Sequence, residues 1–295
     1  MQSRRGGRIG LGIIASGVLT FGGLAPAANA DAARGAEDST VTALSNLGLL
    51  APVAKARSVD SLPAGSGVLT SADGLTVVLE NATLSMKPAT RTEPRLASGA
   101  LVYDSSHGYS YALTGHSSAA DAGYVVIDQE NAPRSYAFEI SANGQPAVLE
   151  LKEGRVLVKD VSGDVVNVIS PAWAVDAAGN DVATTYSVSG STITQYVEHH
   201  GAAYPVVADT RVACSGLFCT LELTKRETGQ LADNALNASV VCGITGPAVV
   251  LCTAAVLAGW AQANVARNTG QCFGTRWANY PLPNGFHNVY VRCYA

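Results

Sequence analysis

The sequence predicts a mixed fold, an antiparallel all-β module followed by a small disulfide-rich α+β domain with a helical hairpin. Short β-rich runs recur through the middle of the chain, and all six cysteines lie at or beyond Cys214. Residues 31–210 carry 10 basic and 20 acidic side chains, a net charge of −10, whereas residues 211–295 carry six and three, a net charge of +3. Cysteine content and charge therefore change at the same point, which indicates a boundary between an all-β module at 64–209 and a domain at 211–295.

The first 30 residues have the organisation of a secretory signal peptide. Three arginines lie within the first eight residues, an uncharged apolar stretch follows, and Ala28-Asn29-Ala30 forms an A-x-A cleavage site. We expect cleavage after Ala30 and secretion of the protein, with an uncleaved membrane anchor as the alternative. Residues 31–63 are rich in Ala and Ser, and we interpret them as a leader or linker with room for a short helix.

The all-β module is predicted from strand-like runs separated by turn signals. Asn143-Gly144 and Gly179-Asn180 tolerate the positive φ angles of tight hairpin turns. Runs spaced by roughly 8–12 residues, without an amphipathic helix between them, are typical of an antiparallel sheet. The clearest runs are 75–80, 136–140, 147–151, 156–160, 165–169, 183–188 and 192–197.

The C-terminal domain is predicted to alternate strands and helices. A strand at 217–223 precedes Thr224-Lys-Arg-Glu227, which fits a capping box at a helix start. We expect one helix from Lys225 to Val241 and a second, mostly apolar helix from Ala248 to Asn268 that Gly270 ends. Two closing strands are expected at 272–276 and 288–292.

The six cysteines are predicted to form disulfides, because an even number in an exported chain usually pairs. Fifteen pairings are possible, and the spacing favours neighbours in sequence. Zinc would need paired C-x-x-C spacings, which are absent, so we expect no metal and no cofactor. The favoured pairs are Cys214 with Cys219, Cys242 with Cys252, and Cys272 with Cys293.

Several polar groups of the sequence are candidates for catalytic or metal sites. Gly115-His116-Ser117-Ser118-Ala119 resembles the G-x-S-x-G nucleophile elbow but lacks its last glycine and the following helix. Asp104, Ser105 and His107 are close in sequence, which does not establish a triad in space. Neither His199-His200 nor the pair Glu150 and Glu153 matches a metal or acid/base motif. We therefore expect no catalytic residues.

Three segments of the module are distinctive, namely Asn131-Ala-Pro-Arg-Ser-Tyr136, Ser170-Pro-Ala-Trp-Ala-Val-Asp-Ala-Ala-Gly179 and Tyr204-Pro-Val-Val-Ala-Asp209. With these segments the chain resembles a β-rich module of uncharacterised exported actinobacterial proteins. The usual ending is Y-P-V-V-A-D-P, and Thr210 replaces its proline here. In such proteins a variable, cysteine-containing C-terminal domain follows the module. The resemblance implies secretion and modularity, and it supplies no enzymatic residues to carry over to this chain.

The apolar helix near 249–266 bears on function. Ala255, Gly259 and Ala263 form a small-residue face beside Trp260, with Lys225, Arg226 and Arg267 nearby in sequence. Such a face either packs inside an ordinary core or, in a cationic stapled hairpin, acts at an anionic membrane. We expect a secreted non-enzymatic protein whose basic C-terminal domain is an extracellular effector or membrane- or surface-binding module.

In this hypothesis the β module is a carrier, or a pro-segment released by cleavage near Ala208–Arg211. The partner is an anionic membrane or cell surface, or a secreted protein target, and not nucleic acid. One alternative is a protease inhibitor or other protein-binding module that uses the loop Tyr280–His287. A second alternative is a serine hydrolase that uses Ser117 and His116.

Overall fold

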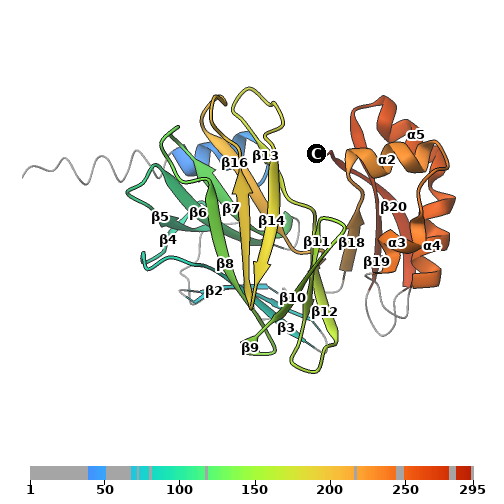
Figure 1. The fold of residues 1–295 in the computed structure, drawn as a ribbon, viewed down its shortest axis with the longest axis horizontal. Coiled ribbons are helices and arrows are strands. Elements are labelled where there is room, and N and C mark those ends of the chain that lie inside the picture. The colour runs from blue at the N-terminus through green and yellow to red at the C-terminus, as the bar shows by residue number, and fades with distance from the viewer. Residues whose placement is uncertain are drawn as a thin grey trace, which may run out of the picture.

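The computed structural model describes residues 39–50, 68–71, 73–79, 82–116, 119–215, 218–243, 249–278 and 284–293. Antiparallel sheets are the main secondary structure of these residues, and a smaller region of strands, helices and disulfides follows them along the chain (Figure 1). The mixed fold class is therefore confirmed. The expected signal peptide at 1–30 lies outside the described residues, as does most of the expected leader at 31–63.

The first sheet contains most of the runs that the sequence predicted. Its strand order is β1-β2-β3-β8-β15-β14, with β9 beside β8. Asn143 and Gly144 both have positive φ, 53° and 74°, in the turn between β8 and β9, as the hairpin signal indicated. The strands are β1 (Val68–Ser71), β2 (Gly74–Val78), β3 (Thr83–Pro88), β8 (Ser135–Ala142), β9 (Gln145–Pro146), β14 (Thr184–Ser189) and β15 (Thr192–Val197).

A second sheet, in the order β13-β16-β7-β6-β5-β4, contains strands that the sequence did not mark individually. Every residue of β16 is buried, because the strand lies between β13 and β7 and is covered on both faces. A strand of this kind has no alternation of apolar and polar residues to reveal it. The strands are β4 (Arg95–Ala97), β5 (Ala100–Asp104), β6 (Tyr109–His116), β7 (Ala119–Ile127), β13 (Trp173–Val175) and β16 (Val206–Arg211).

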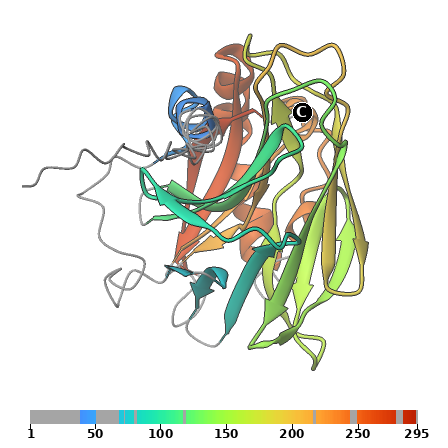
Figure 2. The same cartoon turned by 90° about the vertical axis from the view of Figure 1, so that its left-hand side faces the viewer.

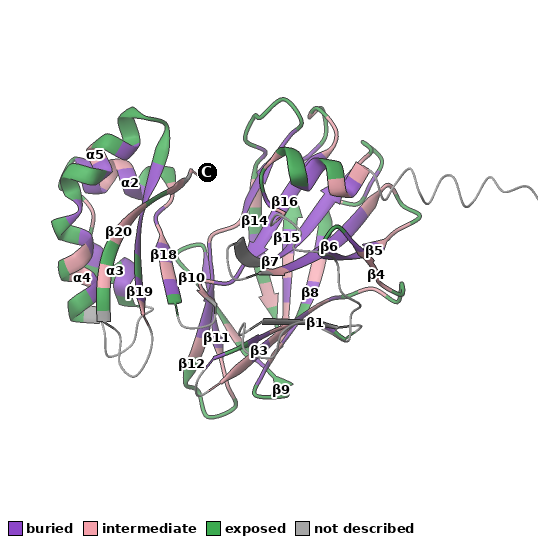
Figure 3. Cartoon of the chain, turned by 180° about the vertical axis from the view of Figure 1, so that it is seen from behind, coloured by how far each residue is buried: buried purple, intermediate pink, exposed green. Residues whose placement is uncertain are grey.

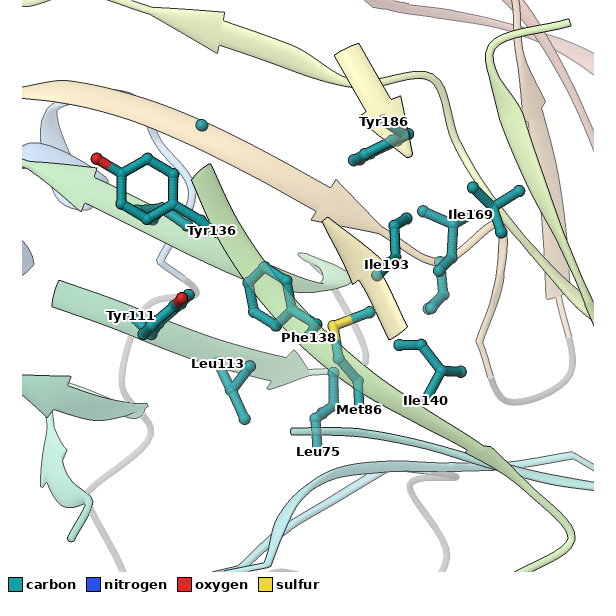
Figure 4. Packing of buried hydrophobic residues seen from close by; sticks show 14 of the residues in the cluster. Leu75, Met86, Tyr111, Leu113, Tyr136, Phe138, Ile140, Ile169, Tyr186 and Ile193 are labelled. Carbon is teal, nitrogen blue, oxygen red and sulfur yellow. The ribbon is translucent and has the colours of Figure 1, made fainter. Parts of the chain in front are cut away.

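The two sheets pack face to face around the main core. Leu113 of β6 lies near Phe138 of β8 and Met86 of β3 in this core (Figure 4). Residues 39–46 form a helix, shown in blue in Figure 2, that covers the opposite face of the second sheet through fully buried Leu44. Part of the expected leader is therefore built into the folded structure.

A third sheet, β10-β11-β12, lies between the sandwich and the C-terminal region (Figure 1). Its strands are β10 (Val148–Lys152), β11 (Arg155–Lys159) and β12 (Val165–Ile169), all close to predicted runs. Val156 and Ile169 face the main core. Leu157 and Val168 instead belong to the core of the C-terminal region.

The C-terminal region is a sheet in the order β17-β18-β19-β20 with helices on the side away from the sandwich (Figures 1 and 3). The capping box is confirmed, since Thr224 Oγ1 accepts from the Glu227 amide and Glu227 Oε2 accepts from the Thr224 amide. The elements are β17 (Cys214–Ser215), β18 (Phe218–Glu222), α2 (Lys225–Ala232), α3 (Ala238–Cys242), α4 (Val249–Ala258), α5 (Trp260–Asn268), β19 (Gln271–Ala278) and β20 (Asn284–Arg292).

Each of the two expected helices is divided. The expectation of one helix from Lys225 to Val241 was wrong, because α2 ends at Ala232 and Asn234 adopts a left-handed φ of 54° that a helix cannot continue. The second expected helix is interrupted at Gly259, which joins α4 to α5. A Cβ at Gly259 would lie 2.2 Å from Phe273 Cζ, so the close approach to β19 requires glycine there.

Candidate functional site

The helices α4 and α5 expose a set of large apolar side chains, which we call the apolar face. Val250 is 73% exposed and Leu251 is 55% exposed, while Leu257, Trp260 and Val265 are each 50% exposed. Ordinary surface helices carry charged or polar residues on their outer side. Helix α4 contains no charged residue at all. A concentration of exposed apolar surface of this kind marks a site of contact with a partner or a membrane.

The apolar face follows the periodicity of a helix. In α4, Val250 and Leu257 are seven residues apart, with exposed Ala254 between them, and in α5 Ala261 and Val265 are exposed and four residues apart. Residues at this spacing lie on one side of a helix, and Figure 3 shows α4 and α5 exposed along the outer edge of the molecule. The apolar face therefore points away from the β module.

The opposite side of these helices contains small residues that are buried or half-buried. Ala263 is fully buried, Gly259 is buried against Phe273, and Ala255 is half-buried. The small-residue spacing thus serves ordinary packing against the sheet and α2, one of the two predicted interpretations. Cys252 and Val256 of α4 are buried on this side as well, whereas Val250, Leu257 and Val265 remain outside.

The charged side chains of α4, α5, β19 and β20 are all basic. After Asp233 the sequence contains no Asp or Glu, but it contains Arg267, Arg276 and Arg292. Arg267 forms an exposed ion pair with Asp233, with 2.8 Å between Nη1 and Oδ1. Lys225 and Arg226 are also exposed, at the start of α2. An anionic surface would meet no negative side chain on α4, α5, β19 or β20.

Three disulfides hold this region together. Cys214 pairs with Cys219, Cys242 with Cys252, and Cys272 with Cys293, which are the pairs that spacing favoured. The second bridge joins α3 to α4, and the third joins β19 to the residue after β20. Within the described part of the chain no group of His, Cys, Asp and Glu could hold a metal ion. Three disulfides indicate an oxidising, extracellular environment.

The residues considered for hydrolysis are not assembled into a site in the described chain. Ser117 lies outside the described residues, and of His116 only the backbone, at the end of β6, is described. Ser105 Oγ lies 3.3 Å from His107 Nδ1 on an exposed turn. Asp104 is bound instead by Arg95, whose Nε and Nη2 lie 2.5 and 3.0 Å from its two oxygens. Asp104 therefore forms no orienting hydrogen bond with His107.

The two adjacent histidines have separate structural partners. His199 is fully buried, with Nδ1 2.9 Å from the Tyr204 hydroxyl and Nε2 3.1 Å from the Pro133 carbonyl oxygen. Burial lowers the pKa of His199, which favours the neutral ring. His200 Nδ1 lies 2.8 Å from Arg134 Nη2. Neither ring is arranged as a metal ligand.

The remaining candidates also have structural positions. Glu150 forms an ion pair with Lys159 at 2.5 Å, and Glu153 occupies the turn between β10 and β11. Trp277 is buried and stacks on Phe286 with ring centroids 5.3 Å apart. Of the loop Tyr280–His287 that was considered for protein binding, residues 280–283 lie outside the described residues.

Sequence reasoning missed a buried ion pair that joins the β module to the C-terminal region. Arg155 of β11 donates from Nη1 and Nη2 to the two carboxylate oxygens of Glu227 at 2.9 and 2.8 Å, and to the Glu222 carbonyl oxygen at 2.8 Å. The two side chains are only 2% and 7% exposed. Burial alone would raise the pKa of Glu227, but hydrogen bonds from Arg155 and Thr224 hold it below its usual value.

A second charged group lies beside this junction. Arg211 donates to Glu222 at 3.0 and 3.1 Å and pairs with Asp209 at 3.0 Å. Asp209 also accepts from Trp173 Nε1 at 2.5 Å. Burial raises the pKa of Asp209 to about 6 despite these partners. Asp209 and Arg211 are neighbours on one face of β16, but their partners Trp173 and Glu222 belong to other strands. Arg155 and Glu227 likewise come from β11 and α2, so no local sequence signal could have revealed the complete groups.

Comparison with known proteins supplies no further constraint. No family model, curated protein or solved structure matches this chain. The candidate site therefore rests on the geometry described above. None of the described helices is long and apolar enough to cross a membrane.

Proposed function

We propose that this chain is an exported, non-enzymatic protein that binds an anionic membrane surface through the apolar face of α4 and α5. The observation that carries the proposal is the exposure of Val250, Leu251, Leu257, Trp260 and Val265 in a segment without acidic residues. Apolar side chains enter the boundary between headgroups and acyl chains, while nearby Lys and Arg add about 1 kcal/mol each at an anionic leaflet.

Export is supported by the sequence of residues 1–30 and by the disulfides. The organisation of the chain resembles that of exported actinobacterial proteins in which a β module precedes a variable C-terminal domain. In this proposal the β module presents the C-terminal region, and the short helices lie on the membrane surface instead of crossing it.

The junction favours a carrier over a cleavable pro-segment. Ala208–Arg211 belongs to β16, which is buried and hydrogen-bonded on both sides. A protease therefore finds no accessible, unpaired segment to bind there. Separation of the two parts would also expose Leu157 and Val168 and leave Arg155 without its carboxylate partner. We therefore propose that the two parts act as one molecule.

Tryptophan fluorescence provides a direct test with the exported chain, residues 31–295. Trp260 is half exposed, whereas Trp173 and Trp277 are 4% and 5% exposed, so a change on binding reports mainly on Trp260. We expect a blue shift and co-sedimentation with vesicles of phosphatidylcholine and phosphatidylglycerol, weaker with phosphatidylcholine alone and weaker at high salt. Absence of binding to both vesicles would contradict the proposal.

A matched pair of variants tests the apolar face itself. Val250→Ser with Leu257→Ser should weaken partitioning by about tenfold or more, because each buried side chain contributes about 1.5–3 kcal/mol. Val161→Ser is the control, since Val161 is 71% exposed but lies in the turn between β11 and β12 of the β module. If the double variant and the Val161→Ser control lost the same amount of vesicle binding, the apolar face would not be the binding site. Labelling by a serine-directed fluorophosphonate would contradict the non-enzymatic part.

A further inference from the structure

The β module contains a cleft of about 410 Å³ that none of the preceding functions uses. It lies where the first residue of the N-terminal helix, the β5–β6 turn, the end of β7 and the segment before β16 meet. Its volume falls within the range of pockets that hold small organic ligands. Four serines line it together with Tyr109, Tyr204, Asp104 and Asp128, and its lining contains no Lys, Arg or His.

Asp128 is the chemically distinctive group of the cleft. Its Oδ1 accepts a hydrogen bond from Ser39 Oγ at 2.5 Å, and its Oδ2 has no partner among the described residues. Asp128 is partly buried, and burial raises the pKa of its carboxyl, with neighbouring Asp104 acting in the same direction. No described cation forms an ion pair with it.

Two other aspartates of the module, Asp104 and Asp176, differ from Asp128 because their carboxylate oxygens have partners. Both oxygens of Asp104 are bound by Arg95, so that carboxylate already has a cationic partner. Asp176 accepts hydrogen bonds from the Asn180 side chain and from the backbone amides of Asn180, Ala203 and Ala178, which hold its pKa low despite burial. Asp128 alone of the three has a carboxylate oxygen without a partner in a concave site.

The tyrosines that line the cleft are held in place by their neighbours. The Tyr204 hydroxyl donates to the His199 carbonyl oxygen at 2.9 Å. Tyr109 packs edge-on against Tyr111 and Tyr136, with ring centroids 5.5 and 5.1 Å apart. Fixed aromatic rings beside a carboxylate form the usual environment in which proteins bind organic cations.

We infer that this cleft binds an organic cation whose primary ammonium or guanidinium group pairs with Asp128, with its alkyl stem against the tyrosines. A cation supplies the counter-charge that Asp128 lacks, and its N–H groups can donate to Oδ2. The group can belong to a free amine or to a Lys or Arg side chain of a peptide. The inference does not depend on membrane binding.

Calorimetric titration of the exported chain tests this assignment. The probes are butylammonium, butylguanidinium and butanol, together with capped Gly-Lys-Gly and Gly-Arg-Gly peptides. We expect the cations to bind and butanol not to bind. Binding by free amines alone would identify a small-molecule ligand, whereas binding by the peptides as well would identify a side chain as the ligand.

Matched variants locate the binding. Asp128→Asn should weaken cation binding by about tenfold or more, because a charge-assisted pair is lost. Asp164→Asn, at an exposed aspartate in the turn before β12, should leave it unchanged. Unfolding curves establish that both variants fold. The inference is overturned if no cation binds, if butanol binds equally well, or if folded Asp128→Asn binds the cations as the parent does.

Discussion

The two parts of this molecule reach a packed core by different means. The β module has no cysteine and buries a large cluster between two sheets, to which Phe138, Tyr136 and Met86 contribute (Figure 4). The C-terminal region has a smaller core and three disulfides, and it completes that core with Leu157 and Val168 from the module. A short chain buries too little surface to be stable without such aids. The C-terminal region is therefore a dependent neighbour of the module.

Among the changes considered, removal of the Arg155–Glu227 ion pair at the junction should lower the free energy of unfolding the most. Arg155→Ala leaves Glu227 buried without its counter-charge, so the free energy of unfolding should fall by about 3–5 kcal/mol. Urea unfolding followed by circular dichroism and by tryptophan fluorescence measures the loss. Arg155→Lys keeps the charge but not the paired hydrogen bonds, and should lose less.

Arg134→Ala is the matched control for this prediction. Arg134 pairs with Glu198 at 3.1 Å, but the side chains are 37% and 49% exposed. An exposed ion pair contributes about 1 kcal/mol or less. If Arg155→Ala and Arg134→Ala had equal effects, the junction would not join the two parts energetically.

Disulfide removal should have the next largest effect, graded by loop length. Cys272 and Cys293 are 21 residues apart, whereas Cys214 and Cys219 are five apart. The chain-entropy relation gives about 3 kcal/mol for the longer loop and about 2 kcal/mol for the shorter one. The corresponding double Cys→Ser variants can be compared by thermal unfolding. A greater loss from the shorter loop would show that chain entropy does not set the order.

Local signals predicted much of the fold, because their causes are local. Asn143-Gly144 makes its turn, Thr224 and Glu227 form their capping box, and the cysteines pair with neighbours in sequence. The division of the apolar helix could not be predicted in this way. Gly259 separates α4 from α5 and lies against Phe273, a contact that only the tertiary structure creates.

The junction was invisible for the same reason. Arg155 and Glu227 are 72 residues apart, and the capping box with Thr224 already gives Glu227 a local role. The sequence predicts the apolar helix, but it does not predict which side of the helix is exposed to solvent. That depends on the sheet, against which the small side packs.

Asp209 of the module and Glu227 of the C-terminal region should change the free energy of unfolding with pH in opposite directions. The folded-state pKa of Asp209 is raised to about 6, above its unfolded value near 4. The folded state therefore binds more protons between these values, and stability should fall by about 2–3 kcal/mol as pH rises through that window. Asp209→Asn, measured by urea unfolding from pH 3 to 8, should remove this decline.

Glu227 should act with the opposite sign. Its folded-state pKa is lowered, so its contribution is present above its unfolded pKa and is lost as pH falls through the folded value. Glu227→Gln should therefore flatten the acid side of the profile, below about pH 4.3. If Asp209→Asn changed the acid side instead, Asp209 would be ionised in the folded protein and the pairing with Arg211 would outweigh burial.

The smallest effect on stability is expected at the apolar face, where adjacent residues of α4 have opposite environments. Val256 is fully buried and Leu257 is half exposed. Leu257→Ser should change the free energy of unfolding by about 0.5 kcal/mol or less, as exposed positions usually do. Val256→Ser should cost several times more, because it places a hydroxyl in the core. If Leu257→Ser leaves the free energy of unfolding unchanged, the Leu257 side chain does not stabilise the fold. Its exposed apolar surface is then available for binding. A large loss from Leu257→Ser would instead assign the apolar face a structural role.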